Sequence, residues 1–575
     1  MKKWLLRLVS FLLVFGLILS LFVRDSLASK NSEVAYGNKG MVVSPHPEAS
    51  KIGAKVLREG GNAVDAAIAM QFALNVVEPM MSGIGGGGFM MVYDARTKKT
   101  SIIESREKAP QGAKSDMFLD ENGNVIPFAQ RSTHGNAVGV PGTLKGLYAA
   151  HDKWGSKPFN RLIRPSIRLA EDGVKVNWVL AEAIKNNQNK LLRSSAKDIF
   201  FRDEEPLKEG DLLVQKDLAK TFRLIQKYGA GVFYRGKIGR AIAETVQQYG
   251  GSMTLKDLKN YHYVERKPLF SDYQGYKIAT MPPPSSGGLT ALQILKMLEK
   301  VDISQYDVRS PEKYHLLTEA MHLAYADRGE YIGDSDFVDV PKKGLLHPEY
   351  IEERSDLIDI SKVNTDVQPG EPWNYEDSFT SDKSGNEDED KVIGETTHYT
   401  VADKWGNIVS FTTTIEQLFG TGIMVPGYGI MLNNELTDFD AVPGGPNEVE
   451  PNKRPMSSMT PTIVFKDDKP FMTVGSPGGA TIIASVAQVL LNVIHYDMDL
   501  KDAIEEPRIY SNKYPSIRWE KGIPEETRLQ LEQMGHKWEN NPVEIGNVNA
   551  LIIRDDGSYY GAADSSREGS SIGIK

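Results

Sequence analysis

The sequence of 575 residues contains no cysteine. This absence excludes disulfide frameworks, thiolate nucleophiles and cysteine-ligated zinc. Histidine is also sparse, with ten residues and no HExxH sequence. His315 and His322 can share one face of a predicted helix, but neither has the additional nearby ligands that a zinc site needs. We therefore expect neither a metal ion nor an organic cofactor.

Other catalytic signatures are missing too. No serine lies in a GxSxG sequence, which argues against an α/β-hydrolase, and there is no P-loop. The glycine-rich run 83–88 contains GxGxxG, but it follows a predicted helix and opens a predicted strand, the reverse of a dinucleotide-binding fingerprint. We interpret it as a tight buried connection. The net charge of −9 offers no basis for binding nucleic acid.

Apolar runs of membrane-spanning length are confined to the N-terminus. A basic start at residues 2–7 precedes an apolar run at 8–23, and small residues flank a potential cut after Ala28. This pattern is typical of a secretory signal peptide, so we predict that residues 1–28 are removed and the protein is extracellular. An uncleaved anchor is the alternative, because the run nearly spans a bilayer. We expect no other stable membrane partner.

Helical periodicity dominates the first part of the chain. The apolar stretch 63–77 predicts a buried helix that Pro79 ends. Further predicted helices cover residues 49–59, 161–171, 218–227, 237–249, 311–328 and a stretch beginning at 289.

The composition changes at residue 395. Residues 361–395 are rich in polar and acidic residues, and such a segment buries too little apolar surface to order itself. It is either a solvated loop or a segment that swings away after a cut at its C-terminal end. Residues 397–401 and 408–414 then alternate like strands around a turn cluster, which predicts a β-hairpin. Further strands are expected at 429–433, 462–465 and 471–474.

Thr396 stands at the head of this hairpin. A turn centred near residue 405 places it opposite Thr414, although turn length alone does not fix the register. A free α-amino group on the same residue can activate a threonine hydroxyl, and its ordinary pKa is about 7.7–8.0. A cut between Glu395 and Thr396 would therefore create a nucleophile and its base together. Gly478 and Gly479, before a predicted helix at 481–494, offer N–H groups for an oxyanion or form a simple turn.

Several motifs together resemble the γ-glutamyltranspeptidases over essentially the whole chain after residue 28. The resemblance implies an α+β fold, the four-layer αββα sandwich of N-terminal-nucleophile hydrolases. It also implies self-cleavage into a large subunit, 29–395, and a small subunit, 396–575, that pair as a heterodimer. The matching stretches are 83–89, 104–107, 396–401, 406–407, 419–422, 432–434, 451–455, 457–459 and 475–479.

The resemblance further implies an activity. Thr396 would attack γ-glutamyl amides such as glutathione or glutamine-like amides, with Thr414 as its orienting partner and Gly478 and Gly479 as oxyanion donors. Water or an amino acid or peptide acceptor would resolve the γ-glutamyl-enzyme. Arg106 would hold the substrate α-carboxylate, assisted by Ser457 and Ser458, and an acidic group would surround the α-ammonium: Glu416, Glu435 and Asp438.

Two departures from the family pattern affect specificity. Glu416 and Glu435 stand where some members have amides, which adds negative charge near the substrate ammonium. The stretch 446–450 is shorter than in members whose equivalent forms a lid. A short stretch suggests an open cleft that admits bulky donors, including poly-γ-glutamate.

Two kinds of alternative remain. On the same fold the chain could be a poly-γ-glutamate depolymerase or a glutaryl- or cephalosporin-type acylase, although a plain diacid needs no acidic group around an ammonium. In another class, it could be an unprocessed secreted binding protein without catalytic activity. A single uncut band on a denaturing gel would favour that second class.

Overall fold

The computed structural model describes residues 33–376 and 394–575. The predicted signal peptide and residues 377–393 of the polar segment before Glu395 lie outside these residues. Within the described ranges, no helix combines the length and apolar character needed to cross a membrane.

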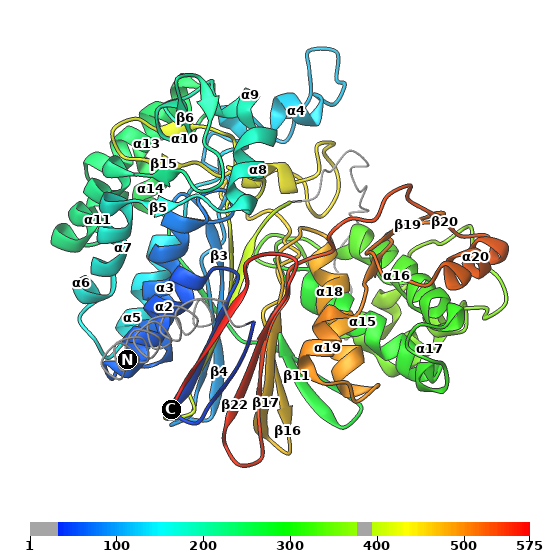
Figure 1. Cartoon of the computed structure of the whole chain (residues 1–575). Coiled ribbons are helices and arrows are strands. Elements are labelled where there is room, and N and C mark those ends of the chain that lie inside the picture. The colour runs from blue at the N-terminus through cyan, green and yellow to red at the C-terminus, as the bar shows by residue number, and fades with distance from the viewer. Residues whose placement is uncertain (1–32, 377–393) are drawn as a thin grey trace, which may run out of the picture.

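Two seven-stranded sheets pack face to face at the centre of the molecule (Figure 1). Each strand runs antiparallel to its neighbours. The first sheet has the order β1 (Val34–Gly37), β22 (Tyr559–Ala563), β21 (Asn549–Ile553), β17 (Lys469–Gly475), β16 (Thr462–Lys466), β11 (Tyr276–Thr280), β10 (Leu269–Tyr273). The second has the order β23 (Ser570–Ile574), β2 (Gly40–Ser44), β12 (Thr397–Asp403), β13 (Ile408–Thr414), β3 (Gly87–Asp94), β4 (Lys99–Glu104), β9 (Val264–Arg266).

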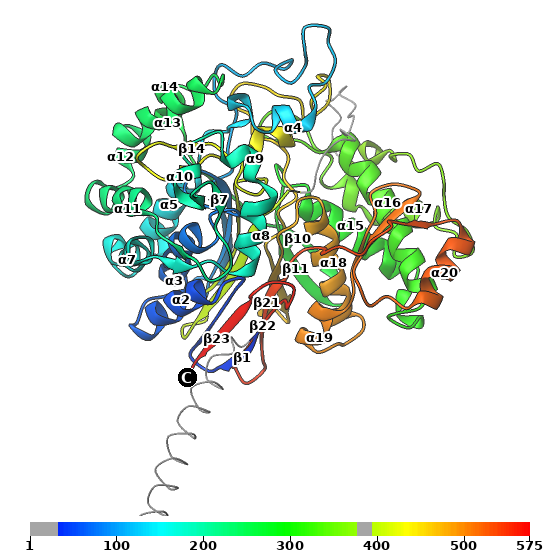
Figure 2. The same ribbon diagram turned by 45° about the horizontal axis from the view of Figure 1, so that its top comes forward.

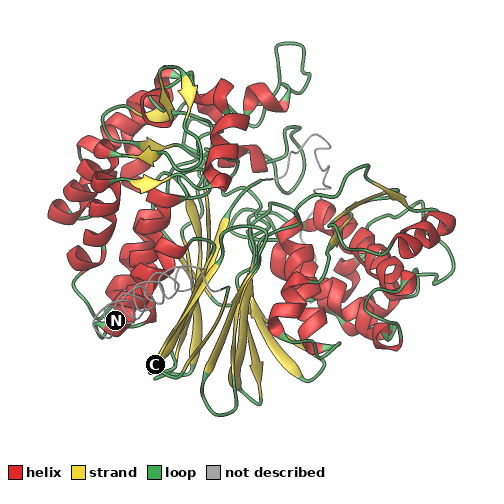
Figure 3. Ribbon diagram, viewed as in Figure 1, coloured by secondary structure: helices red, strands yellow, loops and turns green. Residues whose placement is uncertain are grey.

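Helices cover the outer face of each sheet, and this makes four layers (Figure 3). The turned view in Figure 2 keeps the two helical groups on opposite sides of the strands. On the second sheet lie α2 (Pro47–Arg58), α3 (Ala63–Val77), α5 (Thr143–Trp154), α7 (Arg164–Asp172), α11 (Lys216–Tyr228) and α13 (Lys237–Gln248). On the first sheet lie α15 (Gly287–Lys300), α16 (Pro311–Tyr331), α18 (Thr481–Ile494) and α19 (Leu500–Glu505).

Strand β3 shows why the sheets are buried on both faces. Met90 and Val92 join the core beneath α3, whereas Phe89 and Met91 join the core between the sheets. Successive side chains of a strand point to opposite faces, so an uninterrupted apolar strand must be covered twice. The predicted αββα sandwich is confirmed.

The glycine run before β3 is the buried connection that we predicted. A Cβ atom at Gly86 would lie 2.0 Å from the carbonyl oxygen of Thr414, and one at Gly85 would lie 2.0 Å from that of Met431. Only glycine permits these approaches of one backbone to another. The run therefore sets the second sheet against the chain that follows β13.

Most predicted elements form with small changes at their ends. The helix expected at 161–171 is broken into α6 (Phe159–Leu162) and α7, because Pro165 begins a new helix rather than continuing one. The strand expected at 429–433 shrinks to β15 (Ile430–Met431), which pairs only with β14 (Met424–Val425). The remaining predicted helices and strands are present.

Candidate functional site

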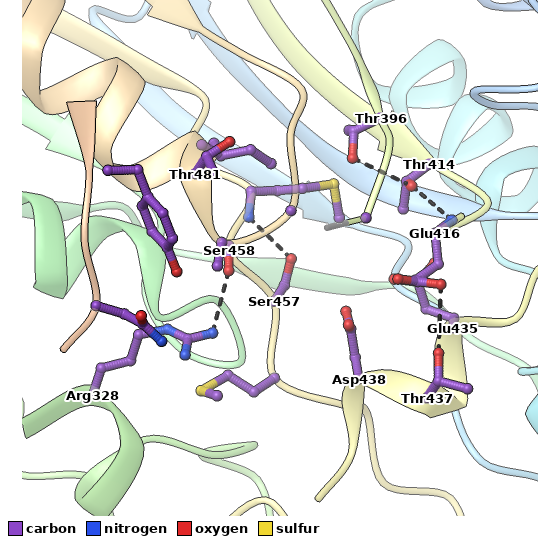
Figure 4. Close-up of a pocket in the computed structure, with 18 of the residues that line it drawn as sticks. Arg328, Thr396, Thr414, Glu416, Glu435, Thr437, Asp438, Ser457, Ser458 and Thr481 are labelled. Atoms are coloured by element: carbon purple, nitrogen blue, oxygen red, sulfur yellow. Dashed lines mark hydrogen bonds between the residues drawn. The ribbon is translucent and has the colours of Figure 1, made fainter. Parts of the chain in front are cut away.

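The candidate site is a cavity of about 430 Å³, and Thr396 is one of the residues that line it (Figure 4). Loops and strand ends that are far apart in the sequence meet here, from β4, β12, β13, the segment before β16 and the start of α18. Most of the sequence-predicted site residues line it: Arg106, Thr396, Thr414, Glu416, Glu435, Asp438, Ser457, Ser458 and Gly479.

The hairpin has the register that the sequence suggested. Thr397 pairs with Thr413, so the next position outward sets Thr396 opposite Thr414. The Thr396 hydroxyl donates to Thr414 Oγ1 at 3.4 Å, and the Glu416 N–H donates to the same oxygen at 2.8 Å. The Thr414 hydroxyl in turn donates to the carbonyl oxygen of Glu395 at 2.8 Å. One hydroxyl thus links the candidate nucleophile to the peptide bond that we expect to break.

Replacing Thr414 by valine is expected to slow self-cleavage by about 100-fold, the usual effect of removing one oxyanion donor. The isosteric valine keeps the packing but cannot donate to the Glu395 carbonyl or accept from Thr396. Denaturing electrophoresis of freshly expressed protein over time measures the rate. Thr414→Ser keeps the hydroxyl and should cleave within several-fold of wild type; equally fast cleavage by the valine variant would refute this role.

His398 cannot serve as the base for Thr396. His398 lies in β12, two residues after Thr396, and is fully buried. Its Nδ1 lies 2.8 Å from Thr412 Oγ1. Burial lowers the pKa of His398 to about 3, so the ring stays neutral and held between the sheets. The α-amino group that a cut would free on Thr396 is therefore the nearest basic group that the hairpin provides.

An arginine that the sequence did not point to holds the side chain before the predicted cut. Arg567 donates to Glu395 Oε2 at 2.8 Å and to Glu544 Oε1 at 2.9 Å. Burial by itself lowers the pKa of Arg567, but the charges of Glu544, Glu395 and Glu78 raise it well above its ordinary value. Arg567 is distant from Glu395 in the sequence, so no local motif could reveal the pairing.

Glu78 gives this region a pH dependence. Its carboxylate accepts from Thr397 Oγ1 at 3.1 Å, and burial raises its pKa from 4.5 to about 7, against the opposing charge of Arg567. The unfolded chain releases this proton first, so the contribution of Glu78 to stability is present below pH 4.5 and is lost as the pH rises through 7.

We expect Glu78→Gln, made in an uncut Thr396→Ala background, to remove this loss. The unfolding free energy of the Glu78 protein should fall relative to the glutamine variant by about 3 kcal/mol between acidic and neutral pH. Urea denaturation across that pH range measures the difference. The exposed Glu59→Gln serves as the control and should leave the pH profile unchanged; parallel profiles for the Glu78 pair would rule out the effect.

The two glycines expected to bind an oxyanion differ in their position. Gly479 lines the cavity, and a Cβ atom there would meet the backbone nitrogen of Gly394 at 2.6 Å. Gly478 is set back: its carbonyl oxygen accepts from the Thr481 hydroxyl at 2.8 Å, and it is not among the cavity-lining residues. Both have positive φ, 128° and 57°, which favours glycine. In the uncut chain, residues 394–395 therefore pass beside Gly479.

Arg106 is buried and bound to two members of the predicted acidic group. Its guanidinium pairs with Glu435 and donates to Asp438 Oδ2 at 2.6 Å. It also donates to the carbonyl oxygens of Pro455 and Met456, at 3.3 and 2.9 Å. Burial alone would lower the pKa of Arg106, but the charges of Glu435 and Asp438 raise it above its ordinary value. Arg106, which we predict to bind the substrate carboxylate, thus also binds two residues of the acidic group.

Burial and mutual repulsion disfavour the charged forms of the acidic group. Burial raises the pKa of Glu435 to about 7, with Arg106 opposing and Asp438 adding to the shift. Burial and the charges of Asp438 and Glu435 raise the pKa of Glu416 well above its ordinary value. A fourth acid, Glu107, lies fully buried beside them, and burial and the charge of Glu435 raise its pKa too. A bound ammonium would relieve this crowding of negative charge.

The two predicted serines lie between the acidic group and Arg328 (Figure 4). Ser457 Oγ accepts from the Met459 N–H at 3.1 Å, and Ser458 Oγ accepts from Arg328 at 3.3 Å. Arg328 also donates to Ser286 Oγ at 2.9 Å. It comes from α16, and helical periodicity gave no signal that its side chain would reach this cavity. Glu107 and Arg328 are the residues nearest the predicted set that sequence reasoning missed.

The short stretch 446–450 turns back against the protein. The Asn447 side chain is buried, donates to the carbonyl oxygen of Asp438 at 2.8 Å and accepts from the Met456 N–H at 2.8 Å. These contacts hold the stretch beside the acidic group rather than across the cavity. They support the predicted open cleft.

The fold also brings possible metal-ligand atoms close to His315, which the sequence did not predict. Ligand atoms of His315, Glu319 and His536 lie within 4.8 Å of one another, all buried. However, His315 Nδ1 and His536 Nε2 are hydrogen bonded at 2.8 Å, and His315 Nε2 lies 2.7 Å from the carbonyl oxygen of Asp359. These hydrogen bonds already occupy both ring nitrogens of His315. The expectation that His315 lacks further ligand atoms nearby was wrong.

Comparison with known proteins gives one consistent result. The family model described as gamma-glutamyltranspeptidase matches residues 49–574. The chain is 62% identical to the "Glutathione hydrolase proenzyme" of Bacillus subtilis (strain 168), over 94% of this chain and 92% of that protein. Cephalosporin acylase from Bacillus halodurans superposes with a TM-score of 0.83 at 26% identity, over 94% and 97% of the two chains. Helicobacter pylori gamma-glutamyltranspeptidase gives 0.57 at 41% identity, over 61% and 99%.

Proposed function

Because the chain belongs to the γ-glutamyltranspeptidase family, we propose that it cuts itself before Thr396 and then transfers γ-glutamyl groups from glutathione and related amides. The observation that carries the proposal is the hydrogen-bonded link from Thr396 through Thr414 to the Glu395 carbonyl. The whole link serves the self-cleavage, and its part between Thr396 and Thr414 serves the later acyl transfer.

Self-cleavage begins with attack of Thr396 Oγ1 on the carbonyl carbon of Glu395. The Thr414 hydroxyl, which already donates to this carbonyl oxygen, stabilises the negative charge that develops there. The C–N bond breaks, the nitrogen of Thr396 takes up a proton, and an ester joins Glu395 to Thr396 Oγ1. Water hydrolyses the ester and leaves a Glu395 carboxylate and a free Thr396 amine. The products are the large subunit, 29–395, and the small subunit, 396–575, which remain paired.

Acyl transfer uses the groups that the cut releases. The free amine of Thr396 accepts the proton of its own hydroxyl, which attacks the γ-carbonyl carbon of the donor. Thr414 orients the nucleophile, and the N–H groups of Gly478 and Gly479 stabilise the oxyanion. The donor amine leaves with a proton, and water or an acceptor amine then takes the γ-glutamyl group from Thr396.

The donor's amino acid end fits the charged wall of the cavity. Glu416, Glu435 and Asp438 surround its ammonium, whose charge offsets their mutual repulsion. Arg106 binds the α-carboxylate, assisted by Ser457 and Ser458. This arrangement distinguishes a γ-glutamyl donor from the plain diacid of a glutaryl-type acylase. Such an acyl group has no ammonium to balance three carboxylates.

Poly-γ-glutamate is a further donor in this proposal, because the stretch 446–450 is held beside the acidic group and does not line the cavity. Incubation of the purified enzyme with the polymer, followed by size-exclusion chromatography, tests the idea. Turnover of glutathione with an unchanged polymer length would limit the enzyme to short donors.

The predicted signal peptide, residues 1–28, makes the enzyme extracellular, where such polymers and peptides are accessible.

The deciding experiment for the activity is direct. The purified protein is incubated with glutathione, with and without glycylglycine, and the products are identified by mass spectrometry. We expect glutamate and cysteinylglycine in both reactions, and γ-glutamyl-glycylglycine only when the acceptor is present. A cleaved, folded protein that leaves glutathione intact would exclude the proposed activity.

A further inference from the structure

One end of the cavity carries cationic side chains that the proposed chemistry does not use. Lys513 and Arg518 line it together with Tyr510 and Asn512. The same four residues line an adjoining hollow of about 140 Å³. They belong to the pair of strands β18 (Ile509–Tyr510) and β19 (Ser516–Trp519) and to the loop between them.

This loop is firmly joined to the segment that precedes α18. The rings of Tyr510 and Tyr325 meet edge to face, with centroids 5.5 Å apart, and the Tyr325 hydroxyl donates to the carbonyl oxygen of Ala480 at 2.6 Å. His322 Nε2 lies 2.7 Å from Ser511 Oγ, which donates to the carbonyl oxygen of Ser516 at 2.7 Å. Because Ala480 follows Gly479, these contacts join the loop that carries the cationic side chains to the reacting centre.

The charges are segregated across the cavity. Figure 4 shows Glu416 and Asp438 on one side of the serine wall and Arg328 on the other. Lys513 and Arg518 also line the cavity, and both belong to the β18–β19 unit rather than to the acidic wall. A donor whose amino acid end lies among the carboxylates brings its scissile bond to Thr396. The part beyond that bond is then free to extend toward positive charge.

The two cations differ in exposure. Arg518 Nε lies 3.2 Å from Glu539 Oε2, and its guanidinium lies 5.8 Å from the centre of the Tyr510 ring. Lys513 is exposed in the loop. The ion pair with Glu539 should weaken the contribution of Arg518 to a ligand's attraction.

We propose that Lys513 and Arg518 form a binding subsite for a carboxylate on the far side of the scissile bond. The ligands are amino acids and peptides with a free carboxylate, either as the departing amine of the donor or as the incoming acceptor. The inference rests on the proposed function and adds to it a preference for leaving groups and acceptors that carry a carboxylate. No covalent step changes, since the subsite acts only on binding and orientation.

Two chromogenic donors isolate the effect: γ-glutamyl-4-nitroanilide and γ-glutamyl-3-carboxy-4-nitroanilide, which differ by one carboxylate on the leaving group. The quantity measured is the ratio of kcat/KM for the carboxylated donor to that for the neutral one. We expect Lys513→Ala to lower this ratio about fivefold and Lys513→Glu about 20-fold. Arg518→Gln should lower it as well. In each case the ratio for glycylglycine over glycylglycine amide as acceptors should fall in parallel.

Two controls separate charge from structure. Glu539→Gln removes the partner of Arg518 and should raise the ratio, a change of sign that damage to the fold would not produce. Lys404→Gln alters an exposed lysine in the β12–β13 turn and should leave both rates at wild-type values. Raising the salt concentration should reduce the wild-type preference, because screening weakens exposed charges.

The outcomes distinguish this inference from the function on which it rests. Wild-type protein that turns over neither donor contradicts both. Wild-type protein that turns over both donors, while Lys513→Glu keeps both ratios within twofold of wild type, overturns the subsite alone.

Discussion

Replacing Thr396 by alanine is expected to leave the protein as one uncut chain and to lower γ-glutamyl turnover by at least about 10⁴-fold, as for other nucleophile deletions. The alanine has no oxygen to attack the Glu395 carbonyl, so the peptide bond persists and the α-amine never forms. Intact mass spectrometry of the purified protein measures the cut, and release of nitroaniline from γ-glutamyl-4-nitroanilide measures the activity.

Two threonine variants sharpen this test. Thr396→Ser keeps a hydroxyl and an amine on the same residue, and we expect it to be cut and active, although more slowly. Thr413→Val changes the threonine next to Thr414. The Thr413 hydroxyl donates to the Gly87 carbonyl oxygen at 3.1 Å rather than to Glu395, so this variant should still be cut. A wild-type protein that is active as a single chain would contradict the mechanism, since its base would then not exist.

Replacing Arg106 by glutamine is expected to have the second largest effect, because two functions are lost together. The buried Glu435 loses its cation, which should lower the unfolding free energy by about 3–5 kcal/mol. Loss of the guanidinium should also lower kcat/KM by at least about 100-fold, mainly through KM, since the cationic partner of the substrate carboxylate disappears. Thermal unfolding and steady-state kinetics measure the two effects separately.

A double variant separates these two contributions. Arg106→Gln with Glu435→Gln removes the buried anion along with its cation, and stability should return most of the way to that of the wild type. Activity should stay low, because the donor's carboxylate still has no partner. If the double variant recovered activity along with stability, Arg106 would be a support for the acidic group and no ligand of the substrate.

The sequence by itself determined the elements around the nucleophile. Alternating residues in 397–401 and 408–414, with a turn cluster between them, specify a hairpin. A turn centre near residue 405 suggested its register, which the structure then fixed. The helix at 63–77 and the glycine connection after it were likewise readable, because an all-round apolar helix must be buried and a glycine run before a strand permits close backbone approach. These are local properties of chain geometry.

Only the tertiary structure decided which distant groups act together. Arg567 reaches Glu395 across the sheet, Arg328 reaches Ser458 from α16, and Lys513 lines the cavity because β18 and β19 pack beside Tyr325. Periodicity records which face of an element is apolar, but it does not record which element lies opposite. Glu435 shows the same division: its identity was visible in the sequence, whereas its raised pKa arises from burial and from the charge of Asp438, against the opposing charge of Arg106.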